Sequence, residues 1–233
     1  MKLERLEELK KSKKDGIVNS MIYITNALKA VNVDIKRKVF REILENFGGR
    51  LRIIVSAAAP IDSKIAKWIE DIGIEFLQGY GLTETSPIAA LTPEYEPSRY
   101  ASTGIAVKDT DIKVLNPNEK GEGELLIKGP TLMLGYYEDE EETRKAIENG
   151  YFHSGDIGRI DADGFIYITG RSKNVIVTQN GKNIYPEEIE MLLNDIPEIK
   201  ESIVYGQKES EDKRDKELII TAKIIPNYKK IWT

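Results

Sequence analysis

The ten residues from Gln78 to Pro87 combine side chains that suit a nucleotide with glycines that let the backbone approach one. Gly79 and Gly81 carry no side chain, and Tyr80 between them offers a flat face for a planar ring. Hydroxyls and a carboxylate follow at Thr83, Glu84 and Thr85. Hydroxyls donate to anionic oxygens, and a carboxylate is a hard ligand that suits Mg²⁺. The alternative is a polar turn around a core tyrosine, because short Gly/Thr motifs are common.

A second polar stretch, Tyr151–Asp156, contains residue types that occur in hydrolase triads. His153, Ser154 and Asp156 lie too close along the chain to converge with the base between the other two groups. We interpret the stretch as a turn, enabled by Gly155, that presents the carboxylate of Asp156 to vicinal hydroxyls such as those of a ribose. For His153 a packing or hydrogen-bonding role is the favoured alternative.

Basic residues after the second stretch carry less information. Arg171 and Lys173 lie in a polar break and could bind anions, although such side chains are more often only solvated. The segment Asn180–Lys182 indicates first a tight turn. The sequence contains no Walker A loop, no G-x-G-x-x-G after a strand and no H-E-x-x-H motif.

The composition excludes several other chemistries. The chain has no cysteine and one histidine, which excludes disulfide scaffolds, cysteine nucleophiles and zinc sites rich in Cys or His. A net charge of −5 over 233 residues argues against nucleic-acid binding through a global basic field. No stretch reaches the roughly 18 apolar residues of a membrane span, and the first residues lack the apolar centre of a signal peptide. We therefore expect a cytoplasmic protein.

The first hundred residues follow the pattern of a parallel sheet. Helical spacing of apolar residues predicts helices within 1–48, one of which runs from Asp34 to Gly48. A strand, a helix and a strand are then expected at 51–56, 62–72 and 74–77. This order, with short connections, is typical of a βαβ unit. Asp62 or Ser63 is the expected N-cap of the helix.

From about residue 98 the chain becomes rich in strands. Three of them are expected at 111–115, 123–128 and 164–169. Asp161–Gly164 resembles half of a calcium loop, but a hairpin turn is favoured. A new α+β pattern follows the polar break, with a helix that opens at Pro186 and strands at 175–177, 203–205 and 218–225. The predicted fold class is α/β, with a β-rich subdomain at about 100–170 and a small α+β domain at 171–233.

Taken in order, these stretches resemble the AMP-forming acyl-CoA synthetase superfamily, which includes firefly luciferase and the adenylation domains of non-ribosomal peptide synthetases. The segments that carry the resemblance are Ser56–Pro60, Gln78–Thr85, Tyr151–Asp156, Gly170–Lys173 and Gly181–Ile189, with Glu124–Pro130 and Met133–Tyr137 between them. Within the superfamily, Gly-Tyr-Gly-Leu-Thr-Glu-Thr-Ser-Pro leans toward long-chain fatty acid–CoA ligases. The resemblance implies that a carboxylate and ATP give an acyl-adenylate and pyrophosphate, and that coenzyme A then displaces AMP as a thioester forms.

The resemblance also implies which residues hold the nucleoside. Tyr80 would stack on the adenine beside Gly81, and Asp156 would accept from the ribose hydroxyls with the help of Arg171. The border of the adenine would be formed by Ala58, Ala59 and Pro60. The implied partners are small molecules (a fatty acid, ATP with Mg²⁺, and coenzyme A), without nucleic acid. Peripheral contact with a membrane stays open.

For the reacting end, the resemblance implies two catalytic residues and a hinge. Thr83 would contact the α-phosphate, and Glu84 would hold Mg²⁺. Lys173 matches the hinge about which the small domain swings between the half-reactions, and Gly181 would face the coenzyme A tunnel.

Two family motifs do not occur in this sequence: the phosphate loop that ends in Pro-Lys-Gly, and the C-terminal motif with the lysine that stabilises the adenylation transition state. We therefore expect an internal-to-C-terminal fragment of a ligase that is weak or inactive without its N-terminal half. Residues 1–170 would be the C-terminal portion of the large AMP-binding domain, and 171–233 a truncated mobile domain. The alternatives are an aryl-CoA ligase, a peptide-synthetase adenylation domain, or a non-catalytic nucleotide-binding remnant.

Overall fold

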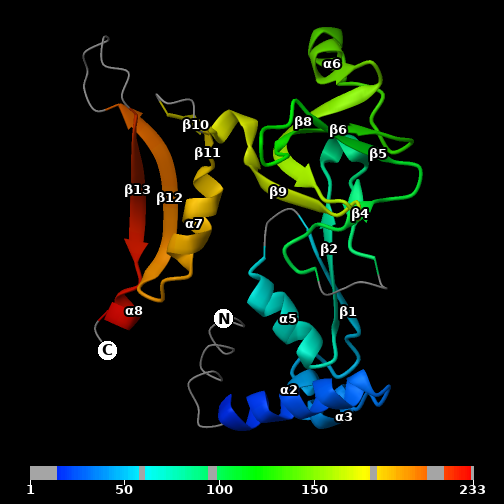
Figure 1. Ribbon diagram of the computed structural model, residues 1–233, viewed down its shortest axis with the longest axis vertical. Coiled ribbons are helices and arrows are strands. Elements are labelled where there is room, and N and C mark those ends of the chain that lie inside the picture. Colours follow the sequence, from blue (N-terminus) through cyan, green and yellow to red (C-terminus); the bar gives the residue numbers. More distant parts are fainter. Residues whose placement is uncertain (1–14, 58–60, 94–98, 179–182, 209–217, 232–233) are drawn as a thin grey trace. The chain divides into compact units, whose positions relative to one another are not determined.

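The computed structural model describes residues 15–57, 61–93, 99–178, 183–208 and 218–231 (Figure 1). The chain forms two compact units, one of residues 1–80 with 91–104 and the other of residues 81–90 with 105–233. Both units mix helices and strands. The described part of the chain contains no helix that is long and apolar enough to cross a membrane.

The first unit contains the predicted βαβ arrangement, which is confirmed. Its elements are α2 (Asp15–Ala30), α3 (Lys36–Val39), α4 (Arg41–Glu45), β1 (Ile53–Ser56), α5 (Ser63–Asp71) and β2 (Glu75–Tyr80). Strands β1 and β2 pair in parallel, with Ser56 opposite Gln78, and α5 connects them. Asp62 is the N-cap of α5, because its carboxylate accepts a hydrogen bond of 2.7 Å from the backbone N–H of Lys64.

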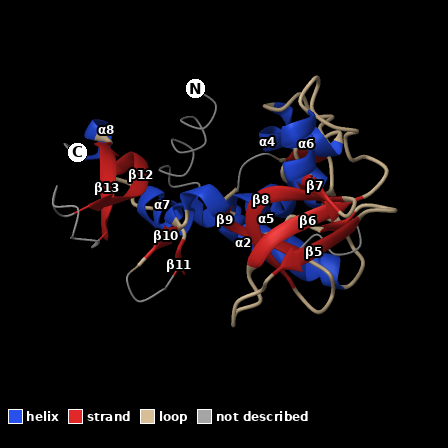
Figure 2. Ribbon diagram, turned by 90° about the horizontal axis from the view of Figure 1, so that it is seen from above, coloured by secondary structure: helices blue, strands red, loops and turns tan. Residues whose placement is uncertain are grey.

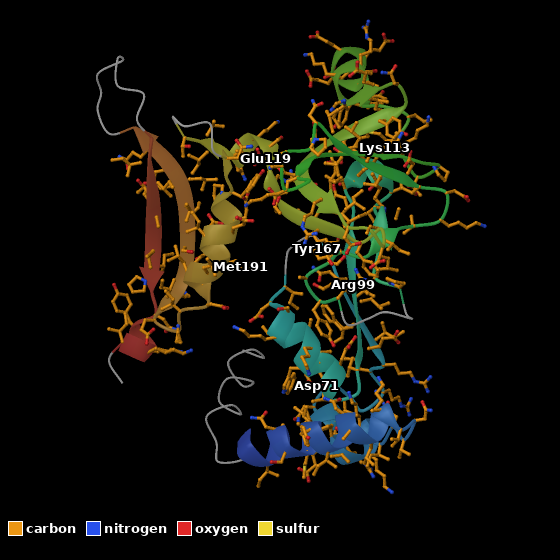
Figure 3. All side chains as sticks on the ribbon, viewed as in Figure 1. Asp71, Arg99, Lys113, Glu119, Tyr167 and Met191 are labelled. Carbon is orange, nitrogen blue, oxygen red and sulfur yellow. The ribbon has the colours of Figure 1, made fainter. Side chains whose placement is uncertain are left out.

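The core of the first unit explains where its helices end. Phe40, Leu44, Ile72 and Ile74 are buried together. One helix was expected from Asp34 to Gly48, but the chain leaves helical geometry at Phe40, which separates α3 from α4 and places its ring in this core. Asp71, labelled in Figure 3, ties α5 to α2 because its carboxylate accepts from Asn26 at 2.9 Å.

An antiparallel five-stranded sheet dominates the second unit. The elements of this unit include η1 (Thr83–Thr85), β4 (Ile105–Ala106), β5 (Asp111–Leu115), β6 (Gly123–Lys128), α6 (Glu140–Ala146), β7 (Ile147–Glu148), β8 (Tyr151–Ile160) and β9 (Ile166–Arg171), whereas β3 (Ala90–Leu91) has one residue in each unit. The strand order is β5-β6-β8-β7, and β9 pairs with β8; α6 lies beside β7 (Figure 2). The predicted hairpin turn between β8 and β9 is confirmed, because Asp161 accepts from the N–H groups of Asp163 and Phe165.

The rest of the second unit is a smaller α+β arrangement. Its elements are η2 (Ser172–Asn174), β10 (Ile176–Val177), β11 (Asn183–Ile184), α7 (Pro186–Asn194), β12 (Ile199–Lys208), β13 (Leu218–Pro226) and α8 (Tyr228–Ile231). Helix α7 begins at Pro186 as predicted and packs along β12, which pairs with β13 (Figure 1). Strand β12 is longer than expected, because Glu201 and Ser202 also pair with β13. The expected domain boundary between residues 170 and 171 stays a prediction.

Candidate functional site

The first candidate stretch begins inside a strand. Strand β2 was expected to end at about residue 77, but its pairing with β1 extends to Gln78 and the strand itself runs to Tyr80. Gln78, Gly79 and Tyr80 therefore belong to the sheet rather than to the turn that follows it. Tyr80 is 8% exposed. Its role as a platform for adenine stays a prediction.

Gly81 marks the point where the chain turns back on itself. A Cβ atom at this position would lie 1.8 Å from the carbonyl oxygen of Pro87 and 2.9 Å from the Cα of Ile88. Such a contact lies far inside van der Waals distance, so a side chain cannot fit here without moving the backbone. Glycine is therefore required by the tight passage of one backbone segment over another.

The two threonines of η1 have different surroundings. Thr85 is fully buried, and its hydroxyl donates to the carbonyl of Leu82 at 3.0 Å and accepts from the Leu82 N–H at 2.9 Å. Its proton is therefore engaged in the turn, which corrects the expectation that Thr85 donates to an anionic ligand. Thr83 is exposed and Glu84 is half-buried. The turn thus fixes its own shape through Thr85 and presents the other two side chains.

Glu84 has a partner that the motif analysis did not identify as functional. The hydroxyl of Tyr136 donates to Glu84 Oε1 at 3.1 Å, and the N–H of Met133 donates to the Glu84 carbonyl at 2.8 Å. Burial, and then the hydrogen bond to Glu84, raise the pKa of Tyr136. A separation of 52 residues between the two side chains leaves no spacing signal. Only the resemblance in Met133–Tyr137 pointed to this segment.

The loop that carries Tyr136 is fixed by the start of α6. The backbone N–H of Tyr136 donates to Thr143 Oγ1 at 2.8 Å, and this hydroxyl donates to the carbonyl of Asp139 at 2.7 Å. A Cβ atom at Gly135 would lie 2.8 Å from Thr143 Cγ2, so the loop passes close against the helix. Tyr136 is therefore held in place from its own backbone as well as through Glu84.

The second candidate stretch is a strand with a bulge and not the turn that was expected. Residues 151–156 lie in β8, where Glu124 pairs with Ile157 and Leu126 pairs with His153. One residue of β6, Leu125, thus faces three residues of β8, Ser154–Asp156. Gly155 sits at φ +69°, a conformation that suits glycine and allows the extra residues to bend out of register.

Asp156 ends this bulge and forms an ion pair. Its carboxylate Oδ1 lies 3.0 Å from Arg171 Nε, and the two residues are directly opposite each other on β8 and β9. Asp156 is 4% exposed, whereas the side chain of Arg171 is 60% exposed. The guanidinium therefore compensates a buried carboxylate while keeping contact with solvent.

The neighbours of Asp156 have structural roles. Ser154 Oγ donates to the Leu125 carbonyl at 2.7 Å and accepts from the N–H of Asp156 at 3.1 Å, so its hydroxyl is not free to act as a nucleophile. His153 Nδ1 lies 3.2 Å from Glu124 Oε2, which bears out the hydrogen-bonding alternative for this histidine. The hydroxyl of Ser154 therefore donates to the Leu125 carbonyl and not to His153, which agrees with the prediction that His153, Ser154 and Asp156 do not form a triad.

The remaining predicted site residues divide into two groups. Lys173 is exposed in η2, next to Asn174, whose amide donates to Glu187 Oε1 at 2.7 Å. Its role as a hinge stays a prediction. Ala58, Ala59, Pro60 and Gly181 lie outside the described residues.

The residues around Glu84 fit Mg²⁺ held together with a phosphorylated ligand. Among the described residues, no group of three or more His, Asp or Glu side chains could hold a metal ion by itself. Mg²⁺ commonly binds through one or two carboxylates and the phosphates of its substrate, and it retains water. A single half-buried carboxylate beside an exposed threonine hydroxyl agrees with that mode of binding.

Comparisons with known proteins agree with the motifs. The model of the family described as AMP-binding enzyme matches residues 5–137. The chain is 34% identical over 179 residues to a long-chain-fatty-acid–CoA ligase, FadD15, from Mycobacterium bovis, with 77% of this chain and 29% of the relative covered. It is 34% identical over 162 residues to a feruloyl-CoA synthase from an Amycolatopsis species, with 67% of this chain and 33% of the relative covered.

A solved structure shows the same fold. O-succinylbenzoate coenzyme A synthetase from Bacillus subtilis, in complex with ATP and magnesium ion, aligns with a TM-score of 0.66 and 28% identity, over 76% of this chain and 37% of that chain. The mixed α/β class expected from the sequence is confirmed by this likeness. The chain spans about a third of the length of the curated relatives that it matches.

Proposed function

Because this chain belongs to the AMP-binding enzyme family, we propose that it binds an adenine nucleotide as part of an AMP-forming acid–thiol ligase. One observation carries the proposal for this chain. The bulge in β8 places the buried carboxylate of Asp156 against Arg171 at 3.0 Å. A charged acceptor that is held in this way can bind both hydroxyls of a ribose, because each carboxylate oxygen accepts more than one hydrogen bond.

In this proposal, each of the other site residues contacts a different part of the nucleotide. Tyr80 stacks on the adenine, Thr83 donates to the α-phosphate, and Glu84 would hold Mg²⁺ while the hydroxyl of Tyr136 donates to its carboxylate. Bound Mg²⁺ supplies positive charge to the phosphate oxygens. The half-buried position of Glu84 and the exposed hydroxyl of Thr83 support these assignments. The resemblance assigns Ala58, Ala59 and Pro60, which lie outside the described residues, to the border of the adenine, and the proposal keeps that assignment.

The reaction follows in two displacements. A carboxylate oxygen of the acid attacks the α-phosphorus of ATP, and pyrophosphate leaves. The thiol of coenzyme A, which loses its proton to solvent, then attacks the acyl carbon; the bond from that carbon to the phosphate oxygen breaks, and AMP leaves as the thioester forms. Lys173 in η2 serves as the hinge between the two steps, and Gly181 faces coenzyme A. The exposed position of Lys173 between β9 and β10 supports a role in a moving segment.

We propose a fatty acid as the acid. The support is the 34% identity to a long-chain-fatty-acid–CoA ligase over 77% of this chain. An aromatic acid is the second candidate, because the identity to a feruloyl-CoA synthase is also 34%. Exchange of labelled pyrophosphate into ATP, measured with palmitate and with ferulate on the complete ligase of which this chain would be a part, separates the two.

The same exchange assay, applied to the 233-residue chain, tests whether this chain is active by itself. We expect slow or absent exchange for the 233-residue chain, because the phosphate-loop motif and the adenylating lysine motif do not occur in it. Binding of AMP without exchange would support a nucleotide-binding role for this chain. Robust exchange with either acid would contradict the expectation that the chain depends on further residues.

A further inference from the structure

The bulge in β8 needs support that the strand ladder does not supply. Three residues, Ser154–Asp156, face only Leu125 on β6, so the regular pattern of backbone hydrogen bonds is interrupted at this point. An N–H group that loses its ladder partner must find another acceptor, because an unpaired buried donor is costly. The structure shows two such replacements, and both come from side chains.

Glu124 supplies the first replacement. Its Oε1 accepts from the N–H of Gly155 at 3.0 Å, while its Oε2 lies 3.2 Å from His153 Nδ1. Ser154 Oγ supplies the second, since it accepts from the N–H of Asp156 at 3.1 Å. The two oxygens of Glu124 therefore hold the chain on both sides of Ser154, across a separation of about 30 residues.

We infer that Glu124 is a positioning residue that fixes the Ser154–Asp156 bulge and thereby sets the direction of the Asp156 carboxylate for a ribose. The inference rests on the proposed function, because it assumes that Asp156 binds the nucleotide. Glu124 itself touches no reacting atom in this account. Its effect passes through Gly155, which donates its N–H to Glu124, has φ +69° and directly precedes Asp156 in the chain.

His153 strengthens the same arrangement. Glu124 and His153 are three-quarters buried at their side chains, and the other ring nitrogen of His153, Nε2, lies 3.7 Å from Glu148 Oε2. Glu148 is 71% exposed at its side chain, so it is only a loose neighbour of the ring. The contrast provides a matched control, because Glu124 and Glu148 approach the same histidine but only Glu124 also binds the bulge.

The first measurement is amide hydrogen exchange of the 233-residue chain, followed by NMR. In Glu124→Ala, the exchange rate of the Gly155 amide should rise at least about tenfold, because its acceptor is lost, whereas the Asp156 amide keeps its acceptor on Ser154. Glu124→Gln retains an acceptor oxygen and should stay close to the unaltered chain, and so should Glu148→Ala. Unchanged exchange in Glu124→Ala would overturn the inference.

The second measurement is the affinity ratio between AMP and 2′-deoxy-AMP, obtained by calorimetry. Glu124→Ala should lower the preference for AMP about tenfold, whereas Glu124→Gln should restore most of it. A variant that merely folds poorly reduces the competent fraction for both nucleotides equally and leaves the ratio unchanged. A preserved ratio in Glu124→Ala would therefore overturn the inference.

Asp156→Asn separates this inference from the proposed function. If Asp156→Asn leaves the affinity for AMP unchanged, the proposed function fails, and the positioning role for a ribose fails with it. If Asp156→Asn weakens AMP binding and Glu124→Ala does not, the proposed function stands and only the role of Glu124 is overturned.

Discussion

The turn at η1 and the bulge in β8 both present an acidic side chain, but they are stabilised over different distances along the chain. In the turn, Thr85 binds both backbone groups of Leu82, three residues away, and Gly81 allows the close passage. In the bulge, the acceptor for the Gly155 N–H is Glu124, 31 residues away. The turn is therefore a local structure, whereas the bulge exists only once β6 and β8 have paired.

This difference predicts how each region responds to substitution. Local turns depend on residues whose backbone conformation is special, so single changes within them should affect folding. A bulge that depends on a distant side chain should instead lose the orientation of its Asp156 carboxylate before the chain loses its fold.

The largest effect is expected at Gly81. Gly81→Ala should lower the free energy of unfolding by about 3 kcal/mol, because the new Cβ would meet the Pro87 carbonyl at 1.8 Å and force the backbone to move. Urea denaturation measures this. Gly16→Ala is the control, since a Cβ there meets nothing within 4 Å, and the change should be neutral or stabilising by up to about 1 kcal/mol. Equal free energies of unfolding for the two variants would refute the close approach of Gly81 to the backbone of Pro87.

A smaller effect on the free energy of unfolding is expected from substitution of Thr85 in η1, with Thr83 as the control. Thr85→Val should cost about 1–3 kcal/mol of unfolding free energy, because it leaves the polar backbone groups of Leu82 without their partner. Thr83→Val should change stability by less than about 0.5 kcal/mol, since Thr83 is exposed. Its effect should appear in nucleotide affinity instead. Identical stability losses would remove the distinction between the two residues.

The smallest effect is expected at Tyr136. Tyr136→Phe removes one hydrogen bond to Glu84 and should cost less than about 1 kcal/mol near pH 7. The folded state raises the pKa of Tyr136. The stability that this phenol contributes is therefore fully present below the ordinary tyrosine pKa of about 10, and it is lost as the pH rises from there through the raised pKa of the folded state.

Thermal unfolding between pH 8 and pH 11 measures this dependence. The loss of stability with rising pH should be shallower in Tyr136→Phe than in the unaltered chain. Tyr137→Phe is the matched control, because Tyr137 is 90% exposed and makes no comparable contact among the described residues. A pH profile in Tyr136→Phe that matches that of the unaltered chain would argue against the bond to Glu84.

The difference between contacts among neighbouring residues and contacts across long sequence separations also explains which features the sequence could predict. The βαβ unit, the Asp161–Gly164 hairpin and the start of α7 at Pro186 depend on neighbouring residues and were predicted correctly, and the N-cap Asp62 is one of the two residues expected at that position. The bulge was mistaken for a turn, because Gly155 and Asp156 have the same residue types in both structures. Only the pairing of β6 with β8 distinguishes them.

Motif spacing could not predict two contacts at the site, because their residues lie far apart in the sequence. Tyr136 meets Glu84 across 52 residues, and Glu124 meets Gly155 across 31. Conversely, Thr85 was expected to face a ligand because its type and position suit one. The structure instead uses its hydroxyl to close the turn, which only the burial of that side chain reveals.

The most direct test of the account is a calorimetric titration of the 233-residue chain with AMP, repeated for Asp156→Asn. The carboxylate that faces Arg171 should provide a hydrogen bond to the ribose worth at least about tenfold in affinity. Asp163→Asn, an identical change at an exposed position of the hairpin turn, should bind AMP as tightly as the unaltered chain. The account predicts weaker binding only in Asp156→Asn; equal AMP affinity in all three proteins would contradict it.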